Sequence, residues 1–365
     1  SILVAVNHRF AFYDRGGHML LGPIDFYNFF GPPSGAYDPR AIYDAGNGTP
    51  GGYNGGHGRF ILLGLTNDKS AQTSSYLLAV SQTEAPQSAT SGWCTYKLNG
   101  AVSSGTVSAY ADFPDVGMDG QNLYVTSEEL SFSSSSFVMH RLLVIPKASV
   151  YPNAASGACP TATSTDFKPL LNPDGSPAFD VEPANQPDAL PGQTTPMYLV
   201  NALMNGGSQL AVRSITLSPS PRLNPPSWVS VSSYDQPDNA LQPGGNPIAN
   251  SGTSLQDASY RYGAIYGANI TEHVSSSLSL SANPYANAQW YKIDPATLTA
   301  QSHVITNTNV AYFTPNIMAG CATATTPGPG GVPQCASPFA ALEVSGAGPS
   351  QPASAYYVLN GGAPT

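Results

Sequence analysis

Residues 59–68 read RFILLGLTND, and three similar apolar runs lie near them: AIYD (41–44), SYLLAVSQT (75–83) and WCTYKLNG (93–100). These runs are short, and clusters of Gly, Pro, Asn, Asp and Ser separate them. Such short runs between turn signals are typical of antiparallel strands, and helical periodicity is nearly absent. This part of the chain therefore predicts one small sheet of four strands.

Similar groups of runs recur at intervals of about fifty to seventy residues along the chain. They include MYLVNAL (197–203), LAVRSITLS (210–218), YRYGAIYGANI (260–270) and VAYFTPNIMA (310–319). Repeated small sheets bury their faces against one another and leave only short edges, which favours a β-propeller. A two-sheet sandwich of this length would need longer strands or a second domain.

We therefore predict an all-β fold in which residues 1–365 form a single β-propeller domain. It would have six or seven blades, mostly of four antiparallel strands, although no exact repeat is legible in the sequence. Long Pro/Gly-rich loops are expected near 151–195, 236–255 and 321–335.

The composition excludes several classes of protein. Among 365 residues there are 36 Gly and 34 Pro, which argues against a helical bundle. The net charge is −9 with only 13 Lys and Arg residues, so nucleic acid and anionic membranes are poor partners. No run of 18 apolar residues is present, so no membrane span is expected.

Four cysteines are present, and none belongs to a C-x-x-C pair of the kind found in zinc ribbons or thioredoxin-like sites. Cys321 and Cys335 bracket a loop without core-forming residues, and a bond between them would remove roughly 3 kcal/mol of unfolded-state entropy. Cys94 and Cys159 would then form the other disulfide. Two disulfides would indicate an oxidising compartment, and a low lysine content fits an exported protein.

Several segments resemble a family of exported bacterial β-propeller proteins whose activity is poorly defined. The segments are VAVNHRFAFYDRGGHML (4–20), YDPRAIYD (37–44), GRFILLGLTND (58–68), FPDVGMDGQNLYVTSEELSF (113–132) and FVMHRLLVIPKASV (137–150). Weaker matches continue towards the C-terminus, so the resemblance covers most of the chain. It departs at the end, where LNGGAPT (359–365) lacks the family's Gly-Asp-Tyr segment and its final strand bearing Trp.

The resemblance implies a propeller fold and a secreted, periplasmic or cell-surface location, and it hardly implies a reaction. We therefore expect a binding or structural module at the cell exterior, as part of an extracellular assembly. Its partners would be protein or carbohydrate, with self-association as a further option. The alternative is an extracellular polysaccharide hydrolase or lyase with carboxylates at the channel mouth, whose spacing a sequence does not reveal.

A polar ligand site is predicted where charged residues stand at strand entries in a chain that has few charges. The candidate ligand-binding residues are Asp38, Arg40, Asp257, Arg261, Tyr260, Tyr262 and Tyr266. Tyrosine supplies flat apolar area with a hydrogen-bonding tip, which suits protein interfaces and sugar faces. The more common explanation is structural: Asp38 caps a turn before Pro39, and Arg40 pairs with a carboxylate to join neighbouring blades.

A weaker prediction concerns Ca²⁺ at Asp115 and Asp119, which follow Asp112 in an acidic string. The loop lacks two ligands of the usual calcium template, so aspartates that form turns are the simpler explanation. No nucleophile elbow and no HExxH helix is present in the sequence, so we predict no catalytic residues and favour binding over turnover.

Overall fold

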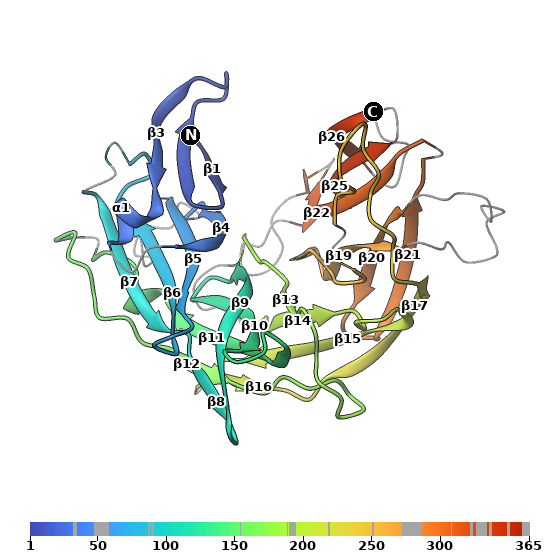
Figure 1. Ribbon diagram of the computed structural model, residues 1–365, viewed down its shortest axis with the longest axis horizontal. Helices are drawn as coiled ribbons and strands as arrows, with labels where there is room; N and C mark the ends of the chain where they lie inside the picture. The colour runs from blue at the N-terminus through green and yellow to red at the C-terminus, as the bar shows by residue number, and fades with distance from the viewer. Residues whose placement is uncertain are drawn as a thin grey trace. The chain divides into compact units, whose positions relative to one another are not determined.

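The computed structural model describes residues 1–31, 35–46, 58–86, 88, 91–153, 155–187, 189, 195–217, 220–249, 252–271, 286–307, 309–321, 324–325, 334–335, 338–348 and 351–359. The chain divides into two compact units (Figure 1). Unit 1 comprises Ser1–Leu170 and Pro187–Gln193, and unit 2 comprises Leu171–Gln186 and Thr194–Thr365. Both units consist of antiparallel sheets, which confirms the all-β prediction. The closed propeller and its number of blades stay predictions.

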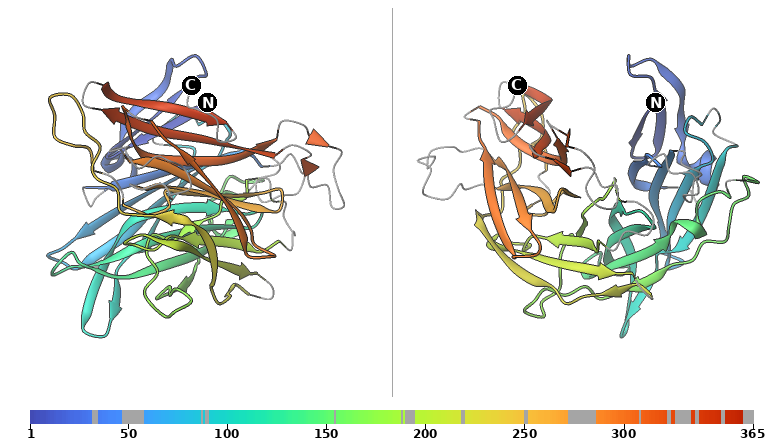
Figure 2. Two further views of the ribbon diagram at one scale, coloured as in Figure 1. Left: turned by 90° about the vertical axis from the view of Figure 1, so that its right-hand side faces the viewer. Right: turned by 180° about the vertical axis from the view of Figure 1, so that it is seen from behind.

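Unit 1 contains three sheets, each formed by strands that follow one another in the chain (Figure 2). The first sheet contains β1 (Ile2–Val6), β2 (Arg9–Tyr13) and β3 (Met19–Asp25), and α1 (Phe26–Phe30) follows it. The second contains β4 (Tyr37–Asp44), β5 (Arg59–Asp68), β6 (Thr73–Ser81) and β7 (Trp93–Asn99). The third contains β8 (Val102–Ser104), β9 (Val107–Met118), β10 (Asn122–Ser131), β11 (Phe137–Pro146) and β12 (Thr165–Phe167), with a short 3₁₀ helix η1 (Lys147–Ser149) after β11.

The second sheet is the four-stranded sheet that the sequence predicts, and its central strands are buried on both faces. One face packs on the first sheet through Phe10, Phe12, Phe60, Leu62 and Leu77. The other packs on the third sheet through Ile61, Leu63, Tyr76, Val125 and Leu143. Residues on both faces of β5 are therefore apolar, as in a strand whose two faces are covered.

Unit 2 contains three larger sheets and one small hairpin. The fourth sheet of the chain contains β13 (Glu182–Pro183), β14 (Met197–Asn201), β15 (Gly207–Thr216), β16 (Arg222–Leu223) and β17 (Ser227–Tyr234). The fifth contains β18 (Asp257–Arg261), β19 (Ala264–Thr271), β20 (Asn287–Asp294) and β21 (Thr299–Ile305). The sixth contains β22 (Ala311–Cys321), β25 (Pro338–Gly348) and β26 (Gln351–Leu359), and the hairpin contains β23 (Ala324–Thr325) and β24 (Gln334–Cys335).

The Cys94–Cys159 disulfide is confirmed, and it ties β7 to the segment after η1 within unit 1. The two cysteines are 65 residues apart in sequence. In the chain-entropy model, the bond reduces the conformational entropy of the unfolded chain and so stabilises the folded state by about 4 kcal/mol. The side chains of Cys321 and Cys335 lie outside the described residues, and that bond stays a prediction. The backbone of Cys335 pairs with Ala324, close in sequence to Cys321.

Three strands share a bulge in which a residue with positive φ precedes a proline. The stretches are Tyr37-Asp38-Pro39-Arg40 in β4, Asp112-Phe113-Pro114-Asp115 in β9 and Phe313-Thr314-Pro315-Asn316 in β22. The residue before proline has a φ of 46° in β4, 43° in β9 and 46° in β22. In each case the strand contains one residue more than its partner across the same interval. Proline donates no hydrogen bond to a ladder, so edge strands and bulges are where it fits.

No helix in the described part of the chain is long and apolar enough to cross a membrane.

A buried carboxyl group lies on the interface between the second and third sheets. Glu129 of β10 is fully buried, and its Oε1 accepts hydrogen bonds from Ser127 Oγ at 2.9 Å and from the Tyr76 hydroxyl at 3.2 Å. Its Oε2 has no hydrogen-bond partner among the described residues. Burial raises the pKa of Glu129 to about 7, although Arg141, 4.0 Å away, favours the ionised form.

We expect this carboxyl group to make unit 1 less stable as the pH rises. The folded chain holds the Glu129 proton more tightly than the unfolded chain, so the free energy of unfolding should fall between about pH 4.5 and 7. Glu129→Gln should remove on the order of 3 kcal/mol of this fall, measured by urea unfolding across that range. Asp294→Asn is the control, because hydrogen bonds from backbone N–H groups lower the pKa of that exposed carboxyl group. If the free energy of unfolding of Glu129→Gln falls as steeply with pH as that of the native protein, Glu129 does not cause the fall.

Candidate ligand-binding site

The bulges of β4 and β9 lie next to each other in unit 1, where an ion pair joins the second sheet to the third. Arg40 Nε donates to Asp115 Oδ1 at 2.7 Å. The Arg40 side chain is 37% exposed, whereas that of Asp115 is only 11% exposed. Arg40 therefore has the sheet-joining contact that the structural explanation expects, and its guanidinium still reaches the surface.

A second contact between the two bulges joins two acidic side chains. Asp38 and Asp112 are both half-buried, and a hydrogen bond links their carboxyl groups. Such a bond requires that one of the two carries a proton. Burial, the negative charge of Asp38 and this hydrogen bond raise the pKa of Asp112 to about 6, while Lys69 opposes the shift. The pair therefore holds its proton under mildly acidic conditions.

The backbone around the acidic pair is held by neutral hydrogen bonds. The Tyr37 hydroxyl donates to the Ala111 carbonyl at 2.7 Å and accepts from Asn67 Nδ2 at 2.7 Å. Burial raises the pKa of Tyr37, so this hydroxyl keeps its proton. Lys69 Nζ donates to Ser135 Oγ at 2.8 Å and lies 5.1 Å from the centre of the Tyr110 ring. Tyr37 thus fixes the backbone next to Asp38, and the positive charge of Lys69 acts on Asp112.

Phe113 places an aromatic ring in solvent beside the acidic pair. It is 51% exposed, and its φ of 43° is a conformation that a bulky side chain rarely adopts. The chain thus keeps an apolar ring on the surface at a backbone cost of order 1–3 kcal/mol. An exposed ring next to groups that donate and accept hydrogen bonds can hold a flat ligand with one apolar and one polar side.

The candidate residues of unit 2 have structural contacts of their own. Asp257 Oδ2 accepts from the backbone N–H of Ile317, and Arg261 Nη1 donates to the Ala319 carbonyl at 2.6 Å. Both bonds join β18 to β22, as the Arg40 pair joins β4 to β9. Because Asp38 and Arg40 belong to unit 1, the shared channel mouth of these four charged residues stays a prediction.

The three tyrosines proposed as contacts differ in exposure. Tyr260 is half-buried and stacks on Tyr198, with ring centres 4.9 Å apart. Tyr262 has a φ of 52° in the turn between β18 and β19. Tyr266 is only 2% exposed and belongs to the core of unit 2, so its ring does not offer the surface contact expected of a ligand-binding tyrosine.

The two proposed metal ligands, Asp115 and Asp119, have different local roles. Asp119 forms the turn between β9 and β10, where its Oδ1 accepts from the N–H groups of Gln121 and Asn122. This is the turn-forming role that the sequence offers as the simpler explanation. Asp115 instead pairs with Arg40.

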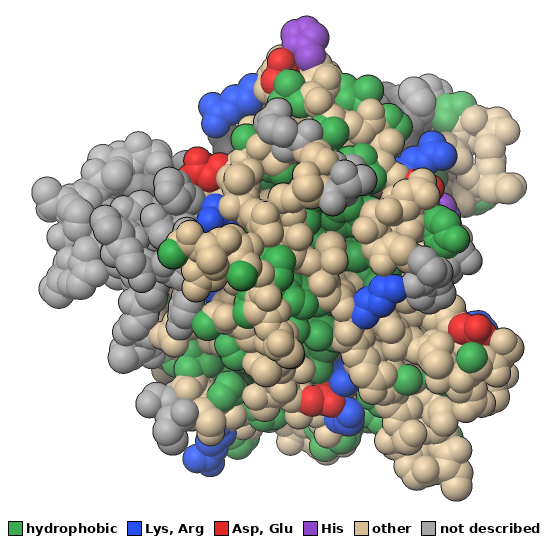
Figure 3. Space-filling model, turned by 90° about the vertical axis from the view of Figure 1, so that its left-hand side faces the viewer, with side chains coloured by type: hydrophobic (Ala, Val, Ile, Leu, Met, Phe, Trp, Pro, Cys, Tyr) green, Lys and Arg blue, Asp and Glu red, His purple; other side chains and the backbone are tan. Residues whose placement is uncertain are grey.

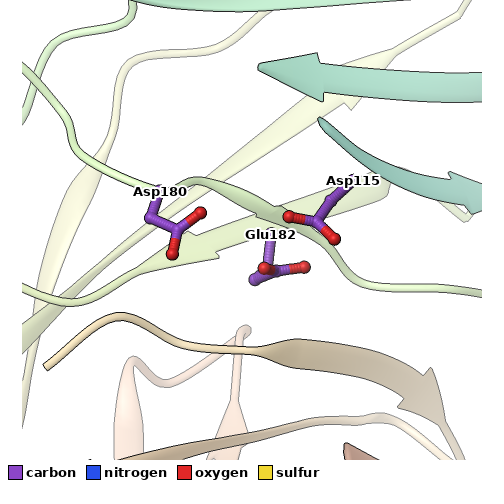
Figure 4. Close-up of side chains that lie close together, drawn as sticks. All are labelled: Asp115, Asp180 and Glu182. Atoms are coloured by element: carbon purple, nitrogen blue, oxygen red, sulfur yellow. The ribbon is translucent and has the colours of Figure 1, made fainter. Parts of the chain in front are cut away.

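Two further buried carboxylates precede the fourth sheet. Figure 4 shows the side chains of Asp180 and Glu182 on the segment that leads into β13. Both are buried, and carboxylates are of the type that hard divalent cations bind. Bound Ca²⁺ stays a prediction.

Sequence reasoning missed Asp112 and Phe113 as members of the site. The available signal was the pair of similar stretches YDPR and DFPD, each with a proline inside a run of strand character. Proline at such a position demotes a strand to an edge or marks a bulge. Asp38 accordingly lies in a bulge within β4, and the turn expected before Pro39 does not form.

The surface around unit 1 carries few charges. On the face seen in Figure 3, acidic and basic side chains stand singly or in small groups among hydrophobic and uncharged ones. Among the described side chains on this face, basic residues do not form a continuous area of the kind that binds nucleic acid.

Comparison with known proteins does not identify a family. No family model matches the chain, and no curated protein sequence matches it. Among solved structures, an α-L-arabinofuranosidase from Lactobacillus brevis is 9% identical and has a TM-score of 0.38, over 84% of this chain and 89% of that one. A variant of the Synechocystis apocarotenoid oxygenase is 10% identical with a TM-score of 0.30, over 98% of this chain and 55% of that one. At these TM-scores neither likeness assigns a fold or an activity.

We expect Arg40 and Asp115 to be energetically coupled. Arg40→Ala should lower the free energy of unfolding by about 1–2 kcal/mol, because it leaves a largely buried carboxylate without its partner. In a double-mutant cycle with Asp115→Ala, the combined loss should be smaller than the sum of the single losses. Arg9→Ala is the control, because the pair of Arg9 with Asp25 is long, at 3.9 Å, and exposed, so its loss should cost less than about 0.5 kcal/mol. Additive effects at Arg40 and Asp115 would contradict the coupling.

Proposed function

We propose that the chain is an exported β-propeller module that binds a neutral carbohydrate at the site between the β4 and β9 bulges. The observation that carries this proposal is the exposed ring of Phe113 beside the hydrogen-bonded carboxyl pair of Asp38 and Asp112. Aromatic surface next to a few polar groups that converge on one place is the usual composition of a small-molecule site.

Each part of the site has a role in the proposed contact. The ring of Phe113 packs on the apolar C–H face of a sugar ring, which requires no charge. The carboxyl pair both donates and accepts hydrogen bonds, and sugar hydroxyl groups do the same. Lys69, whose positive charge acts on Asp112, adds a donor at the edge of the pair. The acidic character of the site disfavours anionic polysaccharides, so neutral chains are the better ligands.

The main competing function is hydrolysis of a polysaccharide, and the raised pKa of Asp112 is the observation that favours it. Glycoside hydrolases keep their two carboxyl groups about 5–5.5 Å apart in retaining enzymes and about 6.5–9.5 Å apart in inverting ones. Two carboxyl groups joined by a direct hydrogen bond are closer than either arrangement. The pair therefore suits binding better than turnover.

The Cys94–Cys159 disulfide supports a location outside the reducing cytosol. A secreted, periplasmic or cell-surface position would bring the module into contact with polysaccharides. The low charge of the chain, with 10% Asp, Glu, Lys and Arg, fits contact with uncharged polymers better than with charged ones.

The test is calorimetric titration of the full chain with soluble neutral polysaccharides, namely β-glucan, arabinoxylan and galactomannan. We expect at least one to bind, and Phe113→Ala to weaken that binding by about tenfold or more, the range of a well-packed contact residue. Val107→Ala is the matched control, because Val107 is a 38% exposed apolar residue at the other end of the same strand. The Val107→Ala variant should bind the polysaccharide with the same affinity as the native chain.

Two results would contradict the proposal. If none of these polysaccharides binds, or if Phe113→Ala binds as well as the native chain, the site is not a carbohydrate site. If reducing ends appear during incubation, and Asp38→Asn or Asp112→Asn stops their release, the chain is a hydrolase.

A further inference from the structure

A cavity lies in unit 1, where α1 and the first sheet meet the start of β4. Its volume is about 420 Å³. The polar and aromatic side chains in its wall are His8, Asp25, Tyr27 and Asn28, and Ala36 completes the wall on the side of β4. The sequence analysis did not single out any of these residues.

The hydrogen bonds around this cavity leave acceptors in its wall. His8 Nδ1 bonds to the Ala36 carbonyl at 2.6 Å, so in the neutral ring Nδ1 carries the proton and Nε2 is an acceptor. Asp25 Oδ1 accepts from the N–H of Tyr27 at 2.8 Å. Its Oδ2 lies 3.9 Å from Arg9 Nε, which is too long for a hydrogen bond. The wall therefore offers an imidazole nitrogen and a carboxylate oxygen to hydroxyl donors.

Two other residues of the wall complete a site of the same chemical type as the one at Phe113. Tyr27 is 47% exposed and supplies aromatic surface, and Asn28 supplies an amide that both donates and accepts. Buried Phe26 forms the apolar base of the cavity. An aromatic surface with convergent hydroxyl-binding groups suits a sugar ring better than a phosphate or another anion, because the only charged group in the wall is an acid.

The cavity and the site at the bulges share one segment of the chain. Ala36 belongs to the cavity wall, and Asp38 of the acidic pair comes two residues later. Two residues of extended chain span roughly 7 Å, so the β4 end of the cavity wall comes close to Asp38. A ligand longer than one ring can therefore contact both places.

We propose that this cavity is a second subsite for the same hydroxyl-rich ligand, and that the ligand is an oligosaccharide chain and not a single sugar. This inference rests on the proposed function and names the kind of ligand that the site would take. Tyr27 and Asn28 contact one ring, while Phe113 and the acidic pair contact another.

The experiment compares affinity with ligand length. Cello-, xylo- and manno-oligosaccharides, from monosaccharide to hexasaccharide, are titrated into the full-length chain and into its Tyr27→Ala, Asn28→Ala and Phe113→Ala variants. We expect the native affinity to rise with length, and Tyr27→Ala and Asn28→Ala to remove about tenfold of the hexasaccharide affinity. They should leave the affinity for the shortest fragments that bind unchanged, whereas Phe113→Ala should weaken every length.

The outcomes separate the two proposals. If Phe113→Ala weakens all lengths but Tyr27→Ala and Asn28→Ala bind the hexasaccharide as the native chain does, the second subsite is wrong and the proposed function stands. If affinity does not depend on length in the native chain, the second subsite is also wrong. If no fragment of any length binds, both proposals fail. Tyr27 and Asn28 are exposed, so unfolding temperatures equal to that of the native chain will show that the variants are folded.

Discussion

A proline inside a strand, preceded by a residue with positive φ, is the constraint on which the candidate site depends. Pro39 and Pro114 donate no hydrogen bond to a neighbouring strand, so β4 and β9 form bulges at these positions. Each bulge adds one residue and redirects the side chains around it. The result is that Asp38 meets Asp112, Arg40 meets Asp115, and Phe113 faces solvent. In a regular strand, strict alternation would limit each of these side chains to one face of its sheet.

The same device occurs in unit 2 with other residues. In β22 the bulge contains Thr314 before Pro315, and near β13 a positive φ at Asp180 precedes Glu182. The bulge in β22 precedes Ile317 and Ala319, whose backbone groups bind Asp257 and Arg261 of β18. Bulges that contain proline thus accompany contacts between neighbouring sheets in both units. In the bulges of β4, β9 and β22, proline is the only residue that the equivalent positions share.

Much of the fold could be predicted from the sequence, because alternation and turn residues are local signals. The four strands of the second sheet and the Cys94–Cys159 disulfide are examples. The pair of Asp38 and Asp112 could not be predicted, because it depends on how two sheets stack and on one extra residue in each strand. Burial of Glu129 was hidden in the same way, since SEEL reads as a polar strand end while Tyr76 of the second sheet packs over it. Tyr266 looked like a contact residue because composition does not distinguish an exposed tyrosine from a core one.

The pKa of Asp112 is the most direct test of this account, because Asp112 can share a proton with Asp38 only where the two bulges meet. Carbon-13 NMR of labelled aspartate carboxyl groups would follow Asp112 during a pH titration of the native chain and of Asp38→Asn. The account predicts that the Asp112 pKa is about 6 in the native chain and falls in the variant, where the negative charge of Asp38 is gone. An Asp112 pKa near its ordinary value of 3.8 in the native chain, or one that Asp38→Asn leaves unchanged, would contradict the pairing.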